Sequence, residues 1–295
     1  MRRSPYLQMH LCVLLWGFTP ILGKLISVSA IPLVFWRMLI VCACLALWRP
    51  VWRQLAQLPL RAILACSGIG LLVTLHWLCF YAAIKLANAS VAATCMALGP
   101  VFLALLEPRL SGRRFNGKEL LLAFLAVPGV ALVVGGIPGE MQEGFWLGVL
   151  SALIAAVFSI GNKRLATDLP ALAMTAIEMA TGVCALTLLL PFWGNLGANL
   201  AWPNPADSAF LLVLAIVCTL LPFALSLVAL RQISVFSAML LVNLEPVYAV
   251  FLAAILFDEQ RQLDAIFYLG VLTILAAVLL HAWWRREKPP AAIHQ

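Results

Sequence analysis

Apolar runs of about 20 residues follow one another along almost the whole chain, and this succession constrains the fold most strongly. A helix of about 20 residues crosses the roughly 30 Å hydrocarbon core of a bilayer. Because hydrocarbon offers the main chain no hydrogen-bond partners, such segments form helices. The runs lie at 8–26, 31–48, 61–84, 88–107, 117–135, 144–163, 169–191, 208–230, 234–257 and 263–284. The sequence therefore predicts an all-α polytopic membrane protein with ten transmembrane helices.

The composition leaves little material for a soluble domain. Hydrophobic residues make up 64% of the chain and charged residues 11%, whereas soluble chains carry about 25% charged residues. A net charge of +7 would favour nucleic-acid binding in a soluble protein, but here Lys and Arg cluster between the apolar runs. We therefore expect the lipid bilayer as a partner, and no nucleic acid.

The distribution of Lys and Arg also predicts the orientation. Cytoplasmic loops of membrane proteins carry an excess of these residues. With the N-terminus inside, the outer segments hold only Lys85 and Arg261, and Lys24 and Arg37 lie within spans. Both termini are therefore expected in the cytoplasm. The first run resembles a signal peptide, but it is expected to stay as a span because it contains Pro20 and Lys24.

The chain also repeats itself. A shift of 146 residues lays 85–134 on 231–280 without a gap and aligns Pro100 with Pro246. A looser match sets 16–24 against 155–163 and pairs the first span with the sixth. Each half then holds five spans, and an odd number makes the second half enter the membrane from the opposite side. Inverted repeats with proline-interrupted helices are typical of secondary transporters, although apolar segments can also resemble each other by chance.

This reading divides the chain into two repeats and a tail. Residues 1–139 form the first five-helix repeat, 140–288 the second, inverted repeat, and 289–295 a short cytoplasmic tail.

The sequence resembles the EamA-type permeases of the drug/metabolite transporter superfamily. The resemblance is carried by LLWGFTPILGK in the first span, Arg37 in the second, FYAAIKLANASVAATCMALGPVF at the third and fourth, and LVALRQISVFSAMLLVNLEPVYAVFLAAILFDE at the eighth and ninth. It implies two inverted five-helix halves around a central cavity lined mainly by spans 1, 3, 4, 6, 8 and 9, in a bacterial inner membrane. One departure is LLEPRLSGRR after the fourth span, where the family often has an acidic residue. Members move amino acids, nucleotide precursors, sugars and drugs, so the resemblance leaves the substrate open.

Four charged residues within spans are the first functional candidates: Lys24, Arg37, Glu178 and Glu245. A charge at mid-span costs roughly 2.5–3.5 kcal/mol on insertion scales. Glu245 is a candidate proton carrier or partner for a substrate ammonium, and the alternative is a structural carboxyl bonded to a neighbouring helix. Arg37 and Glu178 would form a charge pair or gate, unless each is tied to a separate helix. Lys24 would draw anionic groups into the cavity, unless it extends to the interface.

Further candidates are polar and aromatic residues placed to line the cavity, and prolines placed to interrupt spans. The cavity candidates are Trp16, Lys24, His76, Trp77, Tyr81, Met96, Ser159, Asn162 and Asn243. Together they would suit a small amphipathic solute, although each alone is more typical of packing. The expected hinges are Pro20, Pro100, Pro222 and Pro246, because a proline leaves the carbonyl four residues before it without a donor.

Other classes of protein find less support. Ser67 and His76 are two and a half turns apart on one helix, too far for a nucleophile and its base, and the four His are too scattered for a metal site. No Walker A sequence occurs. We therefore predict no enzyme, no catalytic residues, no metal and no cofactor.

The predicted function is a secondary transporter of small organic metabolites, such as amino acids, related metabolites or drugs, working by alternating access. Export is expected from the family resemblance alone, and a proton is the expected coupling ion. A channel or membrane scaffold is the second reading; a channel would need rings of polar residues along its pore, and polar residues are sparse along these spans. An intramembrane enzyme is the last. A homodimer is left open.

Overall fold

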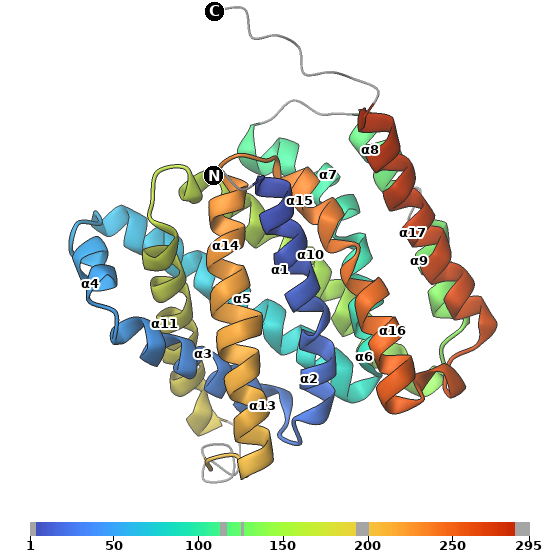
Figure 1. Cartoon of the computed structure of the whole chain (residues 1–295), viewed down its shortest axis with the longest axis horizontal. Helices are drawn as coiled ribbons and strands as arrows, with labels where there is room; N and C mark the ends of the chain where they lie inside the picture. Colours follow the sequence, from blue (N-terminus) through green and yellow to red (C-terminus); the bar gives the residue numbers. More distant parts are fainter. Residues whose placement is uncertain (1–3, 113–116, 125–126, 193–200, 287–295) are drawn as a thin grey trace, which may run out of the picture.

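The computed structural model describes residues 4–112, 117–124, 127–192 and 201–286, and it contains helices but no β-strand among them (Figure 1). The helices of the first half are α1 (Pro5–Gly17), α2 (Thr19–Leu25), α3 (Ala30–Ala46), α4 (Arg49–Ala56), α5 (Leu60–Leu86), α6 (Ala89–Cys95), α7 (Gly99–Ser111), α8 (Gly117–Phe124) and α9 (Val127–Gly135). Those of the second half are α10 (Gln142–Ala166), α11 (Ala171–Leu189), α13 (Pro205–Ala215), α14 (Leu221–Leu230), α15 (Val235–Val242), α16 (Glu245–Phe257) and α17 (Ala265–Arg286). Short 3₁₀ or π segments are η1 (Met96–Leu98), η2 (Gly139–Met141), η3 (Leu190–Phe192), η4 (Ile216–Leu220) and η5 (Glu259–Arg261).

Within the described residues, seven helical segments are long and apolar enough to cross a membrane. They are Pro5–Leu25, Leu60–Leu86, Ala89–Ser111, Gly139–Ala166, Ala171–Leu189, Pro205–Leu230 and Val235–Phe257. The pair α3 and α4 adds an eighth if it is one span, and α17 contributes a shorter apolar stretch at Ala265–Ala276. The predicted all-helical membrane class is confirmed, whereas the number ten stays a prediction. The predicted tail 289–295 lies outside the described residues.

Helix α4 is a feature that the ten predicted runs did not include. It follows α3 at an angle of 90°. Trp48 between the two helices is extended, and Pro50 stands in the first turn of α4, where its missing N–H costs no hydrogen bond. The chain therefore turns sharply at the position where the second predicted run ends.

The four prolines predicted as hinges all occupy the same local position. Each is the second residue of the helix that follows a break: Pro20 in α2, Pro100 in α7, Pro222 in α14 and Pro246 in α16. The breaks are the turn at Phe18, the 3₁₀ segment η1, the π-helix η4, and residues 243–244. Each proline is tolerated there because the first residues of a helix need no N–H partner within it. Their movement as hinges stays a prediction.

The helices pack in reciprocal pairs across the two halves. Helix α1 lies along α14, and α10 lies along α5; likewise α16 packs on α6, and α15 on α7 (Figure 1). Helices α9 and α17 form a pair at one side of the bundle, and α3, α4 and α11 lie toward the other. The centre is thus enclosed by helices from both halves.

The pair α9 and α17 depends on two glycines. A Cβ on Gly270 would lie 2.5 Å from the Gly129 carbonyl oxygen, and a Cβ on Gly129 would lie 2.7 Å from the Gly270 carbonyl oxygen. Neither contact is sterically allowed, so the two backbones touch only because both side chains are absent. Small residues at helix contacts are a common way to pack helices in membranes.

We expect Gly270→Ala to lower the free energy of unfolding by about 1–3 kcal/mol, because the added methyl forces α9 and α17 apart. The measurement is thermal unfolding in one detergent. Gly68→Ala in α5 is the matched control, since a Cβ there meets no atom within 4 Å. Equal melting temperatures for both variants would contradict the close contact.

Candidate functional site

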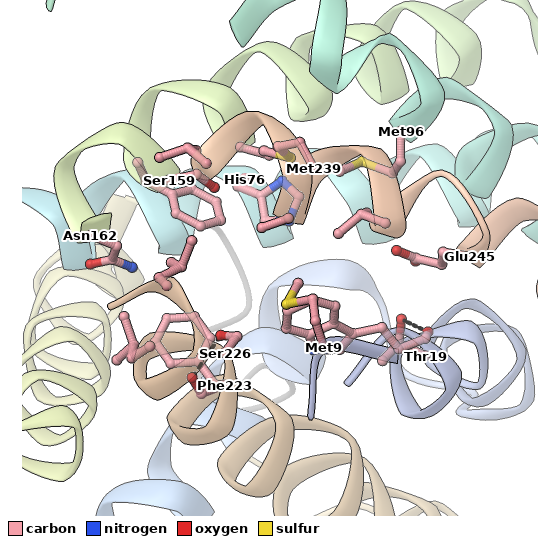
Figure 2. A pocket seen from close by; sticks show the side chains of 18 of the residues that line it. Met9, Thr19, His76, Met96, Ser159, Asn162, Phe223, Ser226, Met239 and Glu245 are labelled. Carbon is pink, nitrogen blue, oxygen red and sulfur yellow. Dashed lines mark hydrogen bonds between the residues drawn. The ribbon is translucent and has the colours of Figure 1, made fainter. Parts of the chain in front are cut away.

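A cavity of about 110 Å³ lies in the middle of the bundle, between the two halves (Figure 2). Its residues come from α1, α2, α3, α5, η1, α10, α14, α15 and α16. They are Met9, Trp16, Thr19, Arg37, His76, Trp77, Phe80, Met96, Ala155, Phe158, Ser159, Asn162, Phe223, Ser226, Leu227, Leu230, Val235, Ala238, Met239, Val242 and Glu245. The walls are mostly methionine, aromatic and aliphatic side chains, and a few polar groups interrupt them, as is typical of small-molecule sites.

Arg37 supplies the positive charge of the cavity, and it is held rigidly. Its Nε donates to the Thr219 hydroxyl at 2.6 Å, and its Nη1 donates to the Tyr81 hydroxyl at 2.7 Å. Its guanidinium carbon lies 3.8 Å from the centre of the Trp77 ring, an arrangement that stabilises a buried cation. Thr219 belongs to the π-helix η4 and itself donates to the Leu214 carbonyl at 2.6 Å. The irregular segment thus positions the arginine.

His76 lines the cavity, and its contacts with Ser151 define the tautomer of its ring. Its Nδ1 lies 3.0 Å from the Ser151 carbonyl oxygen and 2.8 Å from the Ser151 hydroxyl. A carbonyl oxygen only accepts, and the Ser151 hydroxyl donates to the His76 carbonyl at 3.0 Å. Nδ1 therefore carries the proton, and in the neutral ring Nε2 keeps its lone pair. Ser151 therefore determines the tautomer of His76, although Ser151 itself does not line the cavity.

Glu245 supplies the negative charge. It is the first residue of α16, directly after the break and before Pro246, and 6% of its surface is exposed. Figure 2 places its carboxylate at the cavity, on the side of Thr19 and Met96. Among the described residues it has no hydrogen-bond or ion-pair partner. A buried carboxylate in that position is available to a bound solute or a proton.

Most of the predicted site residues meet at this cavity. Trp16, His76, Trp77, Met96, Ser159, Asn162, Arg37 and Glu245 all line it. Their roles stay predictions, because position alone does not test them.

Three of the other candidates lie elsewhere. Tyr81 is fully buried behind the cavity and holds Arg37. Asn243 is buried at the break before α16, and its side-chain nitrogen lies 3.5 Å from the Ala97 carbonyl oxygen. Lys24 pairs with Glu259 at 2.6 Å at one end of the bundle.

The predicted association of Arg37 and Glu178 is not seen among the described contacts. Arg37 bonds Thr219 and Tyr81, as above. Glu178 is fully buried in α11 beside Asn162 and the backbone of Gly70. Neither Glu178 oxygen has a hydrogen bond of good geometry in the described part of the chain. No described contact joins the two residues, and their role as a charge pair or gate stays a prediction.

Several lining residues were missed in the sequence, above all Phe223 and Ser226 in α14. The shift of 146 residues pairs them with Trp77 and Phe80 in α5. Applying the repeat to the third span would therefore have found them. The rings of Trp77 and Phe223 contact each other edge to face, with 6.3 Å between centroids. Asn243 and Ala97, which also contact, are separated by the same 146 residues.

Comparison with known proteins adds the family and the fold. The model of the EamA-like transporter family matches residues 3–135 and again 142–283. Two proteins of Archaeoglobus fulgidus, each named an uncharacterized transporter, are 26% identical to this chain. The alignments cover 95% of this chain and 98% of the first relative, and 88% of this chain and 87% of the second.

One solved structure, described only as the crystal structure of a protein, superposes with a TM-score of 0.72 at 18% identity. The superposition covers 97% of this chain and all of that one. This likeness concerns the fold alone.

We expect Tyr81→Phe to lower the free energy of unfolding by about 1–3 kcal/mol, because the buried Arg37 loses a hydrogen-bond acceptor. Thermal unfolding in detergent measures the effect. Tyr268→Phe is the matched control, since the buried Tyr268 hydroxyl has no partner among the described residues and its removal should cost nothing. A Tyr81→Phe protein as stable as the control would contradict the role of the phenol.

Proposed function

The chain belongs to the EamA-like transporter family, and we propose that it is a secondary transporter that moves a small organic solute by alternating access. The predicted family is thereby confirmed, and the protein is a multi-pass membrane protein. One observation carries the proposal: an apolar cavity lies between the two halves, its Glu245 carboxylate has no hydrogen-bond partner among the described residues, and four of the lining spans are broken before a proline. Family and relatives favour transport over catalysis.

Alternating access requires two halves that can exchange roles, and we propose that they are the two inverted repeats, 1–139 and 140–288. Three observations support this division. The family model matches once in each half. Helix contacts occur in reciprocal pairs across the halves. Residues 146 apart touch each other at Trp77 with Phe223 and at Ala97 with Asn243, as expected where a two-fold axis relates the repeats.

The proposed solute is a small amphipathic metabolite or drug with an amine. Glu245 would pair with its ammonium, and Nε2 of His76 would accept a further hydrogen bond. The rings and methionines would contact its apolar part. Arg37 would attract a carboxylate where the solute has one, which would suit an amino acid.

We propose that a proton is the coupling ion and that Glu245 carries it. A carboxylate that binds either a proton or an ammonium, but not both, exchanges one for the other as the cavity changes sides. The direction proposed is export from the cytoplasm across a bacterial inner membrane, with both termini in the cytoplasm. Export and the bacterial inner membrane are proposed from the family resemblance. The cytoplasmic position of both termini is proposed from the distribution of Lys and Arg.

We expect Glu245→Gln to reduce solute-driven proton flux in proteoliposomes by at least about tenfold, because the amide binds no proton at the pH of the assay. Wild-type protein is first challenged with amino acids, nucleosides, aromatic metabolites and cationic drugs, and any solute that produces flux is then used with the variant. Glu143→Gln, on an exposed residue at the start of α10, is the matched control.

Counterflow of the labelled solute is measured in the same vesicles. Saturable counterflow in wild type supports a carrier, whereas uptake that stays linear with concentration would support a channel. Unchanged proton flux in Glu245→Gln would refute its role as the proton carrier.

A further inference from the structure

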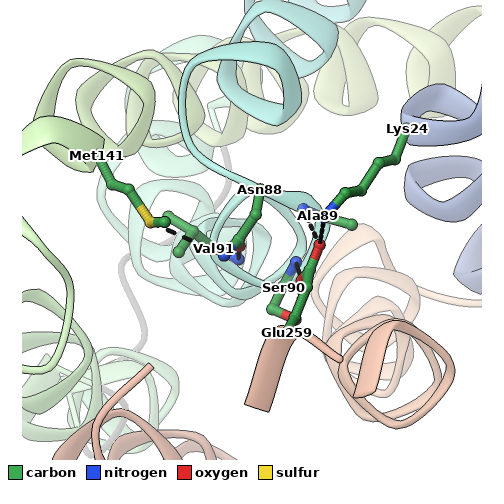
Figure 3. Close-up of polar contacts among 7 residues, drawn as sticks. All are labelled: Lys24, Asn88, Ala89, Ser90, Val91, Met141 and Glu259. Carbon is green, nitrogen blue, oxygen red and sulfur yellow. Dashed lines mark hydrogen bonds and ion pairs between the residues drawn. The ribbon is translucent and has the colours of Figure 1, made fainter. Parts of the chain in front are cut away.

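Glu259 is a buried carboxylate that the proposed solute site does not use. It is the first residue of η5, just beyond α16, and it is 0% exposed. Its Oε1 receives Lys24 Nζ at 2.6 Å and the Ala89 amide at 3.2 Å. Its Oε2 receives the Ser90 amide at 3.0 Å and the Ser90 hydroxyl at 2.6 Å (Figure 3).

These contacts join three elements from both halves of the chain. Lys24 is in the last turn of α2, Ala89 and Ser90 begin α6, and Glu259 follows α16. The carboxylate caps the positive end of α6 and neutralises Lys24 at the same time. Lys24 also lies 4.7 Å above the Phe257 ring. Since the described partners fill both oxygens, the pair is stable only while the three elements stay together.

The pair lies at one end of the bundle, and the cavity extends toward the other. In Figure 1, α2, α6 and the end of α16 lie at the bottom, whereas α1 begins and α14 ends near the top. The cavity lining includes Leu230, the last residue of α14, and Val235, the first residue of α15, but not Lys24, Ala89 or Glu259. The Lys24–Glu259 contact thus lies outside the cavity lining, at the end of the bundle away from the end of α14 and the start of α15.

Two further contacts close the same end. The Ser27 amide donates to Asp207 Oδ1 at 2.8 Å, which joins the segment after α2 to α13. Lys85, at the end of α5, donates to the Ile26 carbonyl. At the opposite end Lys163, the repeat partner of Lys24, donates to the main-chain carbonyls of Leu230 and Ile233. The two lysines thus hold related helix ends by different contacts.

We propose that Glu259 and Lys24 form the latch that keeps this end closed while the cavity is accessible from the other, and that the latch opens once in each transport cycle. Glu259 is thus a positioning residue: it touches no solute and acts through α2 and α6. The proposal rests on alternating access, because only that mechanism requires the closed end to open. By the predicted orientation, the latched end faces outward.

Hydrogen–deuterium exchange in lipid nanodiscs tests the latch without a known substrate. In Lys24→Met, whose side chain still packs against Phe257, we expect the main-chain amides of residues 86–92 to exchange at least about tenfold faster than in wild type. The reason is that breaking a buried ion pair is strongly destabilising. We also expect slower exchange at 229–236, because opening one end closes the other. Glu259→Gln, which keeps an acceptor for α6, should show the same opposite changes.

Two matched variants separate the latch from a local effect. Lys24→Arg keeps the charge and should exchange like wild type. Arg261→Met removes a cation from the exposed pair with Asp258, 3.9 Å apart in the same segment, and should change neither region. Faster exchange at 86–92 alone would make the pair a local structural contact and overturn the proposal, as would no change at all.

A failed latch and a failed transporter give different results. Absence of wild-type counterflow refutes transport whatever the exchange data show. Counterflow with no coupled exchange refutes only the latch.

Discussion

The structure depends on one constraint, the hydrogen bonding of the main chain in hydrocarbon. Lipid cannot replace a lost main-chain bond, so irregular backbone is tolerated only where protein or a cavity surrounds it. In the described part of the chain, predicted spans 1, 4, 8 and 9 are each broken, and in each of these four cases a proline stands second in the continuing helix. The breaks before α2, α7 and α16 border the cavity through Thr19, Met96 and Glu245.

The break before α14 shows how such irregularity is used. The π-helix η4 positions Thr219, whose hydroxyl satisfies the Leu214 carbonyl and at the same time accepts from Arg37. The Thr219 side chain thus satisfies a main-chain carbonyl and also holds the guanidinium of Arg37 at the cavity. A regular helix would leave Arg37 without this acceptor, and a buried guanidinium without acceptors is costly.

The buried charges are divided between two tasks. Arg37 and Glu245 lie at the cavity. Arg37 is hydrogen-bonded to Thr219 and Tyr81, whereas Glu245 has no hydrogen-bond partner among the described residues. Lys24 and Glu259 satisfy each other at one end of the bundle. Burying a charge is costly at both places. At the cavity it leaves a carboxylate available to a ligand, and at the end of the bundle it is offset by a contact that holds helices together. Only the presence or absence of protein partners distinguishes them.

The sequence by itself determined the helical membrane class, the family, the positions of the four breaks before a predicted hinge proline, and eight of the residues that line the cavity. They follow from patterns that the sequence shows directly: apolar length, proline position, quoted motifs and a repeat that aligns Pro100 with Pro246. Tertiary structure alone decided the partners. Glu178 does not meet Arg37, Tyr81 lies behind the cavity, and Lys24 finds Glu259, which is 235 residues away. Depth within a span can be read from sequence, but the direction in which a side chain points depends on which helices pack against it.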